Sequence, residues 1–306
     1  MIANPVASPI FWPIAMAVMA ALALGLAGVL AARRELRSTL LRRWGSWLCI
    51  AILYGGCVLA GPLPLLLLVW VLALQASREY AAMVGLPAAY TSALLIAATT
   101  TIAAVSLGAG PAVALVPLAL IGVPLIAERP WGGSDLGRER AEPGPPASSL
   151  AFTVLGWAYI ALPLAHLYLA QGHPSFLVAL AFAVAASDIG AYVTGSFFGR
   201  HALAPAVSPR KTWEGVAGNV AGAYGGMAVA AFAMPGHIPN PALWLLPLAI
   251  SAAAVSGDLA ESFLKRSFGV KDTGSWFPGF GGLLDRIDSF LFALPVGYYL
   301  WLLLAQ

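Results

Sequence analysis

Residues 262–288 read SFLKRSFGVKDTGSWFPGFGGLLDRID, a polar stretch that separates two apolar runs near the end of the chain. Basic residues in this stretch lie beside three aspartates, Asp272, Asp285 and Asp288. A glycine-rich turn at 278–282 comes between the charged groups, and glycine lets a backbone approach a ligand closely because it has no side chain. Carboxylates suit a hard divalent cation, whereas lysine and arginine suit phosphate. The stretch therefore predicts a site for a metal ion and a polyphosphate.

The rest of the chain has the composition of a membrane protein. Of its 306 residues, 60% are hydrophobic and 9% are charged, whereas about 25% are charged in a typical soluble domain. Apolar runs of about 20 residues recur along the sequence, and a run of that length can cross a bilayer as a helix. We therefore predict an all-α fold, a polytopic transmembrane helical bundle. Nucleic acid is not an expected partner, because the chain has no basic helix and no surface of interleaved basic and aromatic residues.

About ten hydrophobic segments can be placed along the chain. They are 10–32, 47–60, 63–76, 88–106, 112–127, 150–170, 176–198, 216–234, 243–255 and 290–304. The first is expected to be an uncleaved anchor, because basic residues follow it and none precedes it. A polar loop rich in glycine and proline at 129–146 is the best candidate boundary. It predicts an N-terminal membrane bundle at 1–147 and a C-terminal catalytic membrane domain at 148–306.

The basic residues predict how the bundle is oriented. With the N-terminus outside, ten spans place all 16 lysines and arginines on one side of the membrane. The loops of the other side lie at 61–62, 108–111, 171–174 and 235–241 and contain no lysine or arginine. By the positive-inside rule, the basic side is cytoplasmic. We expect an integral protein of the cytoplasmic (inner) membrane, with its active site on the cytoplasmic face and both termini on the opposite face.

Three aspartates are candidate metal ligands. Asp285 and Asp288 are three residues apart and would share one face of a helix, where both carboxylates can reach one cation. Asp258 follows Ser256-Gly257 at the cytoplasmic end of the preceding apolar segment, where an unpaired acid is costly. The alternative for the pair is a solvated helix face. The nearby glycine turn and basic residues favour a metal site.

Residues 208–215 read SPRKTWEG and open the 216–234 segment on the same side of the membrane. Arg210 and Lys211 can neutralise phosphate, Ser208 and Thr212 can donate hydrogen bonds, and a helix N-terminus there favours an anion. The alternative is an interfacial flank with a tryptophan anchor and basic side chains that reach toward water.

Asp188 lies within an otherwise apolar run. An intramembrane carboxylate is a candidate functional residue. The alternative is a structural polar contact with a neighbouring helix.

The residues quoted so far resemble those of a known family. The pattern S-x-L-K-R-x4-K-D-x-G-x2-F-P-G-F-G-G-x2-D-R-I-D at 262–288 resembles the signature of phosphatidate cytidylyltransferases, also called CDP-diacylglycerol synthases. It fixes many polar residues over 27 positions. The pattern D-x2-A-Y-x2-G at 188–195 and the 208–215 motif are also similar to that family. The resemblance covers about the C-terminal half of the chain, and the N-terminal half agrees in hydropathy alone.

The resemblance implies that CTP and phosphatidate react to form CDP-diacylglycerol and pyrophosphate, with Mg²⁺ and a possible second cation as cofactors, in phospholipid biosynthesis. CTP, the phosphatidate lipid of the bilayer and a second copy in a homodimer are the implied partners. The implied catalytic residues are Asp258, Lys265, Arg266, Lys271, Asp285, Arg286 and Asp288, of which Asp258, Asp285 and Asp288 bind metal. The implied nucleotide-pocket residues are Ser208, Lys211, Thr212, Glu214 and, in a second tier, Asp188.

One position departs from the pattern. The family usually has histidine where this chain has Phe280, just before the two glycines. Phenylalanine fills similar space but cannot form the hydrogen bond that histidine would offer to a phosphate or a carboxylate. This departure leaves open altered efficiency, a related lipid substrate or a divergent paralogue. Two other classes of function also stay open: a CTP-dependent enzyme that acts on another, prenyl-type lipid, and a lipid transporter or lipid-binding relative without catalysis. A transporter is expected to place polar groups at mid-membrane and on both faces, whereas the charge here is one-sided.

Overall fold

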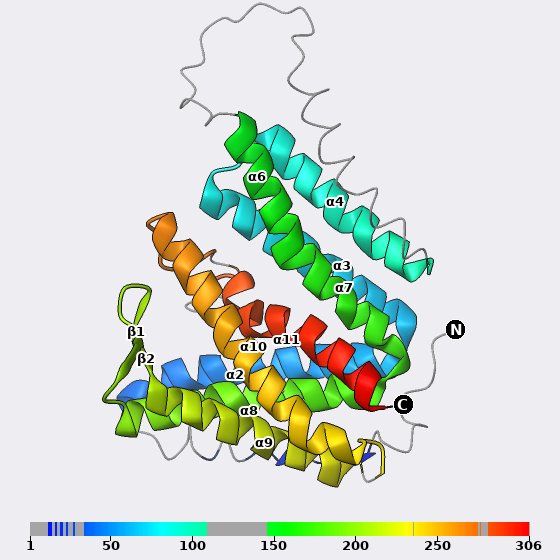
Figure 1. The fold of residues 1–306 in the computed structure, drawn as a ribbon, viewed down its shortest axis with the longest axis vertical. Coiled ribbons are helices and arrows are strands. Elements are labelled where there is room, and N and C mark those ends of the chain that lie inside the picture. The colour runs from blue at the N-terminus through cyan, green and yellow to red at the C-terminus, as the bar shows by residue number, and fades with distance from the viewer. Residues whose placement is uncertain are drawn as a thin grey trace, which may run out of the picture.

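The computed structural model describes residues 34–108, 146–234, 236–274, 276 and 281–305, with isolated positions between 12 and 27. The chain there is almost entirely helical (Figure 1). Its elements in order are α2 (Arg34–Ala60), α3 (Pro62–Val84), α4 (Ala88–Ser106), α6 (Pro146–Gly156), the π-helix η3 (Trp157–Ala161), α7 (Leu162–Leu169), the 3-10 turn η4 (Ala170–Gly172), α8 (Pro174–Phe198), strands β1 (Ala202–Ala204) and β2 (Ser208–Thr212), α9 (Trp213–Ala233), α10 (Asn240–Ser267) and α11 (Leu284–Leu304).

Seven helical stretches in the described part are long and apolar enough to cross a membrane, and α6 through η4 form one of them, Ser148–Gly172. A shorter apolar helix, Leu48–Ala60, is the second part of α2. The prediction of an all-α polytopic membrane protein is therefore confirmed. The predicted segment 112–127 lies outside the described residues and 10–32 lies mostly outside them, so the number ten stays a prediction.

Two helices beside the 262–288 stretch are longer than predicted. Helix α10 continues past the apolar run 243–255 to Ser267, and α11 begins at Leu284, six residues before the run 290–304. The polar residues extend these helices because they pair with each other. Lys265 contacts Glu261 one turn earlier, and this spacing places oppositely charged side chains together on a helix. Both carboxylates of the pair Asp285 and Asp288 thus lie on the first turns of α11, as predicted.

Helices α8 and α9 run antiparallel and pack closely along their length (Figure 1). Glycines allow this approach. A Cβ atom at Gly222 would collide with the carbonyl oxygen of Ala186, and one at Gly226 would collide with that of Phe182. Small residues commonly bring membrane helices this close, because the bilayer supplies no hydrophobic force between them. Helix α10 packs on α9 and α11 on α10, so that four consecutive helices form one packed group.

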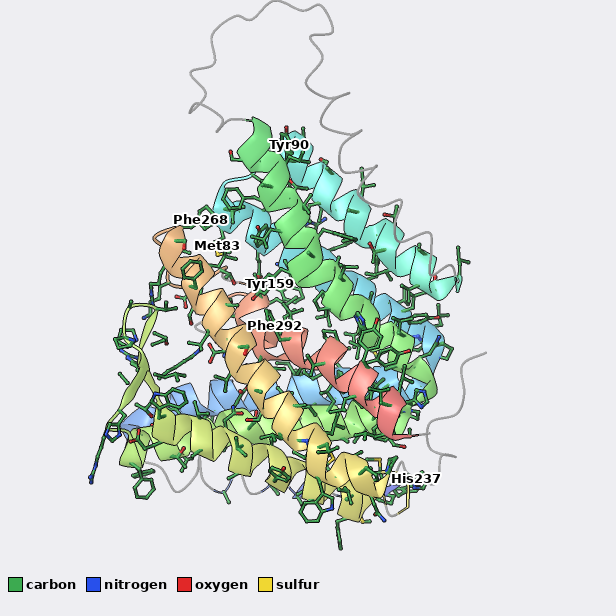
Figure 2. The ribbon with its side chains drawn as sticks, in the orientation of Figure 1. Met83, Tyr90, Tyr159, His237, Phe268 and Phe292 are labelled. Atoms are coloured by element: carbon green, nitrogen blue, oxygen red, sulfur yellow. The ribbon has the colours of Figure 1, made fainter. Side chains whose placement is uncertain are left out.

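The helices α2 to α4 pack into the same core as the helices from α6 onward. A continuous cluster of buried residues includes Leu65 and Tyr80 of α3 and Leu291 of α11. Tyr80 Oη donates a hydrogen bond to the carbonyl oxygen of Phe152 at 2.9 Å. Between α11 and the π-helix, the rings of Tyr159 and Phe292 pack edge to face, with their centroids 6.1 Å apart (Figure 2). The division into bundles at 1–147 and 148–306 stays a prediction.

Candidate active site

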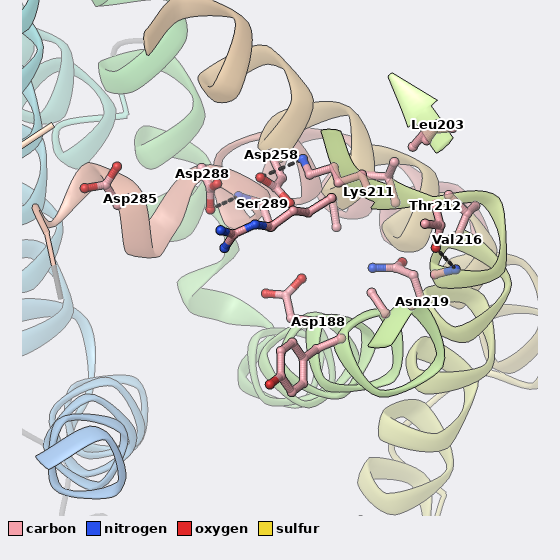
Figure 3. A pocket seen from close by; sticks show the side chains of 17 residues that line it. Asp188, Leu203, Lys211, Thr212, Val216, Asn219, Asp258, Asp285, Asp288 and Ser289 are labelled. Carbon is pink, nitrogen blue, oxygen red and sulfur yellow. Dashed lines mark hydrogen bonds and ion pairs between the residues drawn. The ribbon is translucent and has the colours of Figure 1, made fainter. Parts of the chain in front are cut away.

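A pocket of about 360 Å³ opens where α8, α9, α10 and α11 meet the β1–β2 hairpin (Figure 3). Its polar lining comes from Asp188, Arg210, Lys211, Thr212, Asn219, Asp258, Asp285, Asp288 and Ser289. A second pocket of about 440 Å³ adjoins it and shares Tyr192, Arg210 and Thr212 as walls. Segments that are distant in the sequence therefore meet at one site, and six of the predicted site residues line it.

The hairpin brings Lys211 into the pocket. Strand β2 pairs antiparallel with β1, with Ala202 opposite Thr212. This small sheet was not predicted, because 208–212 was assigned to a helix flank. Lys211 Nζ lies 2.7 Å from Asp258 Oδ1 of α10. The Asp258 side chain is 42% exposed, so the pair stays within reach of a ligand.

Thr212 is the N-cap of α9, as the predicted helix N-terminus requires. Its Oγ1 accepts a hydrogen bond from the backbone nitrogen of Gly215 at 3.1 Å, a contact typical of threonine before a helix. Because this contact uses Oγ1 as an acceptor, the hydroxyl group can still act as a donor to a ligand. Thr212 lines both pockets.

Glu214 and Ser208, two other predicted pocket residues, are not among the described residues that line the pockets. Glu214 instead contacts the two residues that precede strand β1. Its Oε2 accepts a hydrogen bond from the backbone nitrogen of Arg200 at 3.1 Å, and its Oε1 lies 2.6 Å from Nδ1 of His201. Ser208 is the first residue of β2, opposite Ala204. Both residues therefore support the strand that carries Lys211.

Lys265 forms a buried ion network behind the pocket. Its Nζ lies 2.7 Å from Glu261 Oε2 and 2.8 Å from Asp285 Oδ1. The other oxygen of Asp285 accepts hydrogen bonds from the backbone nitrogens of Gly282 at 2.8 Å and Thr273 at 3.0 Å. Removal of one partner from such a network leaves a buried charge uncompensated, which is strongly destabilising. The network fixes the end of α10 against the start of α11.

Three aspartates on three helices face the pocket: Asp188 of α8, Asp258 of α10 and Asp288 of α11 (Figure 3). Ser289, beside Asp288, lies next to the Asp188 carboxylate. Asp285 touches the pocket, but its carboxylate turns away from Asp258 and Asp288 in Figure 3, toward Lys265. Within the described ranges, no three acidic, histidine or cysteine side chains lie close enough together to hold a metal by themselves. Metal binding by Asp258, Asp285 and Asp288 stays a prediction.

The remaining predicted basic residues are not among the described residues that line the pocket. Arg266 is exposed, and its Nη1 donates to the carbonyl oxygen of Val270 at 3.3 Å. Lys271 is exposed on the connection that follows α10, and Arg286 is half-buried on α11. Phe280, the departure from the family pattern, lies outside the described residues.

Several polar residues of the site were not predicted. Asn219 of α9 is buried and lines the pocket, and its Oδ1 accepts a hydrogen bond of 2.7 Å from Ser251 of α10. Glu261 is buried in the Lys265 network. Glu79 of α3 is buried against the start of α11. Asn219 lies within the apolar run 216–234 and so carries the same signal that singled out Asp188. Glu79 and Glu261 lie beyond the apolar runs 63–76 and 243–255, so that signal does not mark them.

Comparison with known proteins places these observations in a family. The profile of the cytidylyltransferase family matches residues 41–304. The chain is 41% identical over 150 residues to a phosphatidate cytidylyltransferase of Staphylococcus saprophyticus, a match that covers 48% of this chain and 56% of that protein. It is 44% identical over 116 residues to that of Bacillus subtilis, covering 37% of this chain and 42% of that protein.

A third relative, the phosphatidate cytidylyltransferase of Mycobacterium leprae, is 42% identical over 129 residues, which cover 41% of this chain and 39% of that protein. The chain thus spans about half the length of these relatives, or less. The family profile, in contrast, extends from α2 to the end of α11 and takes in both pockets. The chain therefore belongs to the cytidylyltransferase family.

Proposed function

We propose that this protein is a phosphatidate cytidylyltransferase, which converts CTP and phosphatidate to CDP-diacylglycerol and pyrophosphate. The observation that carries the proposal is the pocket itself. It combines Lys211 and Arg210, which suit phosphates, with aspartates from three membrane helices. Three relatives of 41–44% identity carry the name of this activity. The adjoining second pocket, with Arg210 in the shared wall, provides room for a second substrate.

The reaction needs little covalent chemistry from the protein. An oxygen of the phosphatidate phosphate attacks the α-phosphorus of CTP, a new P–O bond forms, and the bond to pyrophosphate breaks. The lipid phosphate is already an anionic nucleophile, so no serine or cysteine has to be activated. The barrier arises mainly from repulsion between the two anions and from charge on the leaving group. Lys211 and Arg210 can stabilise that charge and hold the reactants in line.

We propose that Asp258 and Asp288, with Asp188 nearby, hold Mg²⁺ together with the CTP phosphates. Mg²⁺ in nucleotide enzymes is usually bound by one or two carboxylates, water and substrate phosphates, so three preassembled protein ligands are not required. The donor set fits: three carboxylates face a pocket into which Lys211 and Arg210 bring two positive charges. When bound, the ion would offset negative charge on the reacting phosphates. Asp285 fits less well, because its carboxylate turns away from Asp258 and Asp288 (Figure 3) and both of its oxygens already accept, one from Lys265 and the other from backbone amides.

We propose that the lipid enters along α8. Ile189 and Tyr192 of this helix are 65% and 75% exposed, and Tyr192 lines both pockets. Exposed apolar side chains on a membrane helix face the acyl chains of the bilayer. The phosphate of phosphatidate could therefore reach Arg210 while its acyl chains stay in the membrane. The positive-inside rule supports a cytoplasmic position for this site.

The test is incorporation of radiolabelled CTP into lipid by the purified protein, with phosphatidate and a prenyl lipid as separate substrates. We expect a phosphatidate-dependent product in the native chain. Asp288→Asn should lower its rate by about 10²-fold, as loss of an electrostatic group in an active site typically does, with an unchanged melting temperature. A product formed with the prenyl lipid alone would replace the proposed substrate. No product with either lipid, or a near-normal rate for Asp288→Asn, would contradict the proposal.

A further inference from the structure

Glu79 connects the N-terminal helices to the polar stretch that follows α10. It lies on α3, 6% exposed, and its Oε2 accepts a hydrogen bond of 2.9 Å from the backbone nitrogen of Leu284. Thr273 Oγ1 lies 3.5 Å from the same oxygen. The other oxygen, Oε1, accepts from Gln75 Nε2 at 3.0 Å, one turn earlier on α3. Both oxygens of this buried carboxylate therefore have partners, and one partner is 205 residues away in the sequence.

Two glycines of the polar stretch, Gly274 and Gly282, pack directly on this carboxylate. A Cβ atom at Gly282 would collide with Oε2 of Glu79 and would lie 2.5 Å from Thr273 Oγ1. A Cβ atom at Gly274 would approach the Glu79 carboxyl carbon to 3.0 Å. Neither glycine has a positive φ. Close packing on Glu79, not an unusual backbone conformation, therefore accounts for glycine at both positions.

Glu79 also completes the start of α11. The first amides of a helix have no partner within the helix, and a negative charge at that end is stabilising. The N-cap residue, Leu283, has no side-chain oxygen that could accept from these amides. Glu79 supplies one from another helix, at Leu284, the first residue of α11. Asp285 and Asp288 lie on the turns that begin there.

We propose that Glu79 is a positioning residue for the reaction. It holds Thr273, Gly282 and the first turn of α11 against α3, so that Asp285 stays on Lys265 and Asp288 faces the pocket. Glu79 itself is not among the described residues that line the pocket, and it acts through the segment that it holds. The effect on turnover rests on the proposed function, whereas the effect on the segment does not. This gives the N-terminal helices a part in the reaction beyond anchoring.

Glu79→Ala, Glu79→Gln and Ser77→Ala in the full chain test this role, by amide hydrogen exchange of peptides that cover 273–290 and by steady-state kinetics. Ser77 is a matched control, because it is buried on the same helix and its Oγ has no hydrogen-bond partner among the described residues. In Glu79→Ala, exchange across 273–284 should rise about tenfold or more while exchange of α8 and α9 stays native. Its kcat should fall by about 10- to 100-fold, as a misplaced active-site group typically causes.

Glu79→Gln keeps an oxygen acceptor for the Leu284 amide, so exchange of the segment should stay close to native and most of the kcat should return. In all three variants the KM for CTP should change by less than about threefold, because no group that contacts CTP is removed. Ser77→Ala should match the native chain in both measurements.

Four outcomes separate the claims. Unchanged exchange at 273–284 in Glu79→Ala would overturn the proposal, and so would a normal kcat beside a loosened segment. A uniform rise in exchange over all helices would show a general stabilising role and would also overturn it. If the native chain makes no lipid product but Glu79→Ala loosens 273–284 selectively, the proposed function fails while the holding role of Glu79 stands.

Discussion

Lys211 lies on strand β2 of the hairpin, contacts Asp258 of α10 and lines the pocket. Its buried ammonium lies 2.7 Å from Asp258, whose side chain is 42% exposed, so a phosphate that enters the pocket would meet this positive charge at the ion pair. Lysine acts on phosphate as a compact point charge, whereas arginine binds as a planar fork, so the two are not interchangeable here.

We expect Lys211→Met, which keeps the aliphatic stem, to lower kcat/KM for CTP by about 10²-fold. Lys211→Arg should recover part of this loss. If Lys211 and Asp258 act as a unit, the double variant Lys211→Met/Asp258→Asn should lose less than the product of the two single losses. Strictly multiplicative losses would show that the pair does not act as a unit, and a normal kcat/KM in Lys211→Met would remove Lys211 from the reaction.

At the scale of elements, the α8–α9 contact places two polar pocket residues, Asp188 and Asn219, on helices that cross the bilayer side by side. The stripe Gly190, Gly218, Gly222 and Gly226 makes this possible, since a Cβ at each would collide with atoms of the facing helix. Neighbouring Gly225 is exposed and has no atom within 4 Å of the place where its Cβ would lie.

Gly226→Ala and Gly225→Ala are therefore a matched pair with opposite expected effects. Alanine is the better helix former by about 0.5–1 kcal/mol, so Gly225→Ala should be neutral or slightly stabilising. Gly226→Ala should destabilise the protein by about 1–3 kcal/mol, because the methyl group must displace the backbone of Phe182. Unfolding in detergent, followed by circular dichroism, measures both. Equal stability of the two variants would show that α8 and α9 do not depend on this close approach.

At the scale of the whole molecule, the connections between the helices from α8 to α11 differ in charge. Those at the pocket end contain lysine and arginine, and those at the opposite end do not. The connection between α8 and α9, which contains the β1–β2 hairpin, lies at the pocket end and carries Arg200, Arg210 and Lys211. Lys271 lies on the described part of the connection that follows α10. The connections at the other ends of α8, α9 and α10, near 171–173 and 236–239, contain no lysine or arginine. This asymmetry predicts that the pocket end is cytoplasmic.

Single cysteines in a Cys49→Ala/Cys57→Ala background test the orientation. Gly172→Cys and Asn240→Cys, both at exposed positions, should react with a membrane-impermeant maleimide in intact cells. Ala206→Cys, exposed in the hairpin turn, should react after permeabilisation alone. The reverse pattern would place the pocket on the outer face, where cytoplasmic CTP does not reach it.

The composition was enough to predict the class of fold, and the motifs were enough to predict the family. A long apolar run in a bilayer must form a helix, because no water is present to satisfy its backbone. The spacing of Asp285 and Asp288 predicted a shared helix, and the structure places both on α11. The family also followed from local patterns, since the residues at 188–195, 208–215 and 262–288 carry it without knowledge of their contacts.

The tertiary structure decided which groups act together. It brought Asp188 to Asp258 and Asp288, turned Asp285 toward Lys265, and placed Glu79 on Leu284. Spacing along a helix predicts which side chains share a face but does not predict which helix packs against that face. That choice depends on side-chain volumes and on close approaches such as those of the glycines of α8 and α9. The same packing of helices brings the amide of Leu284 to Glu79, 205 positions away in the sequence.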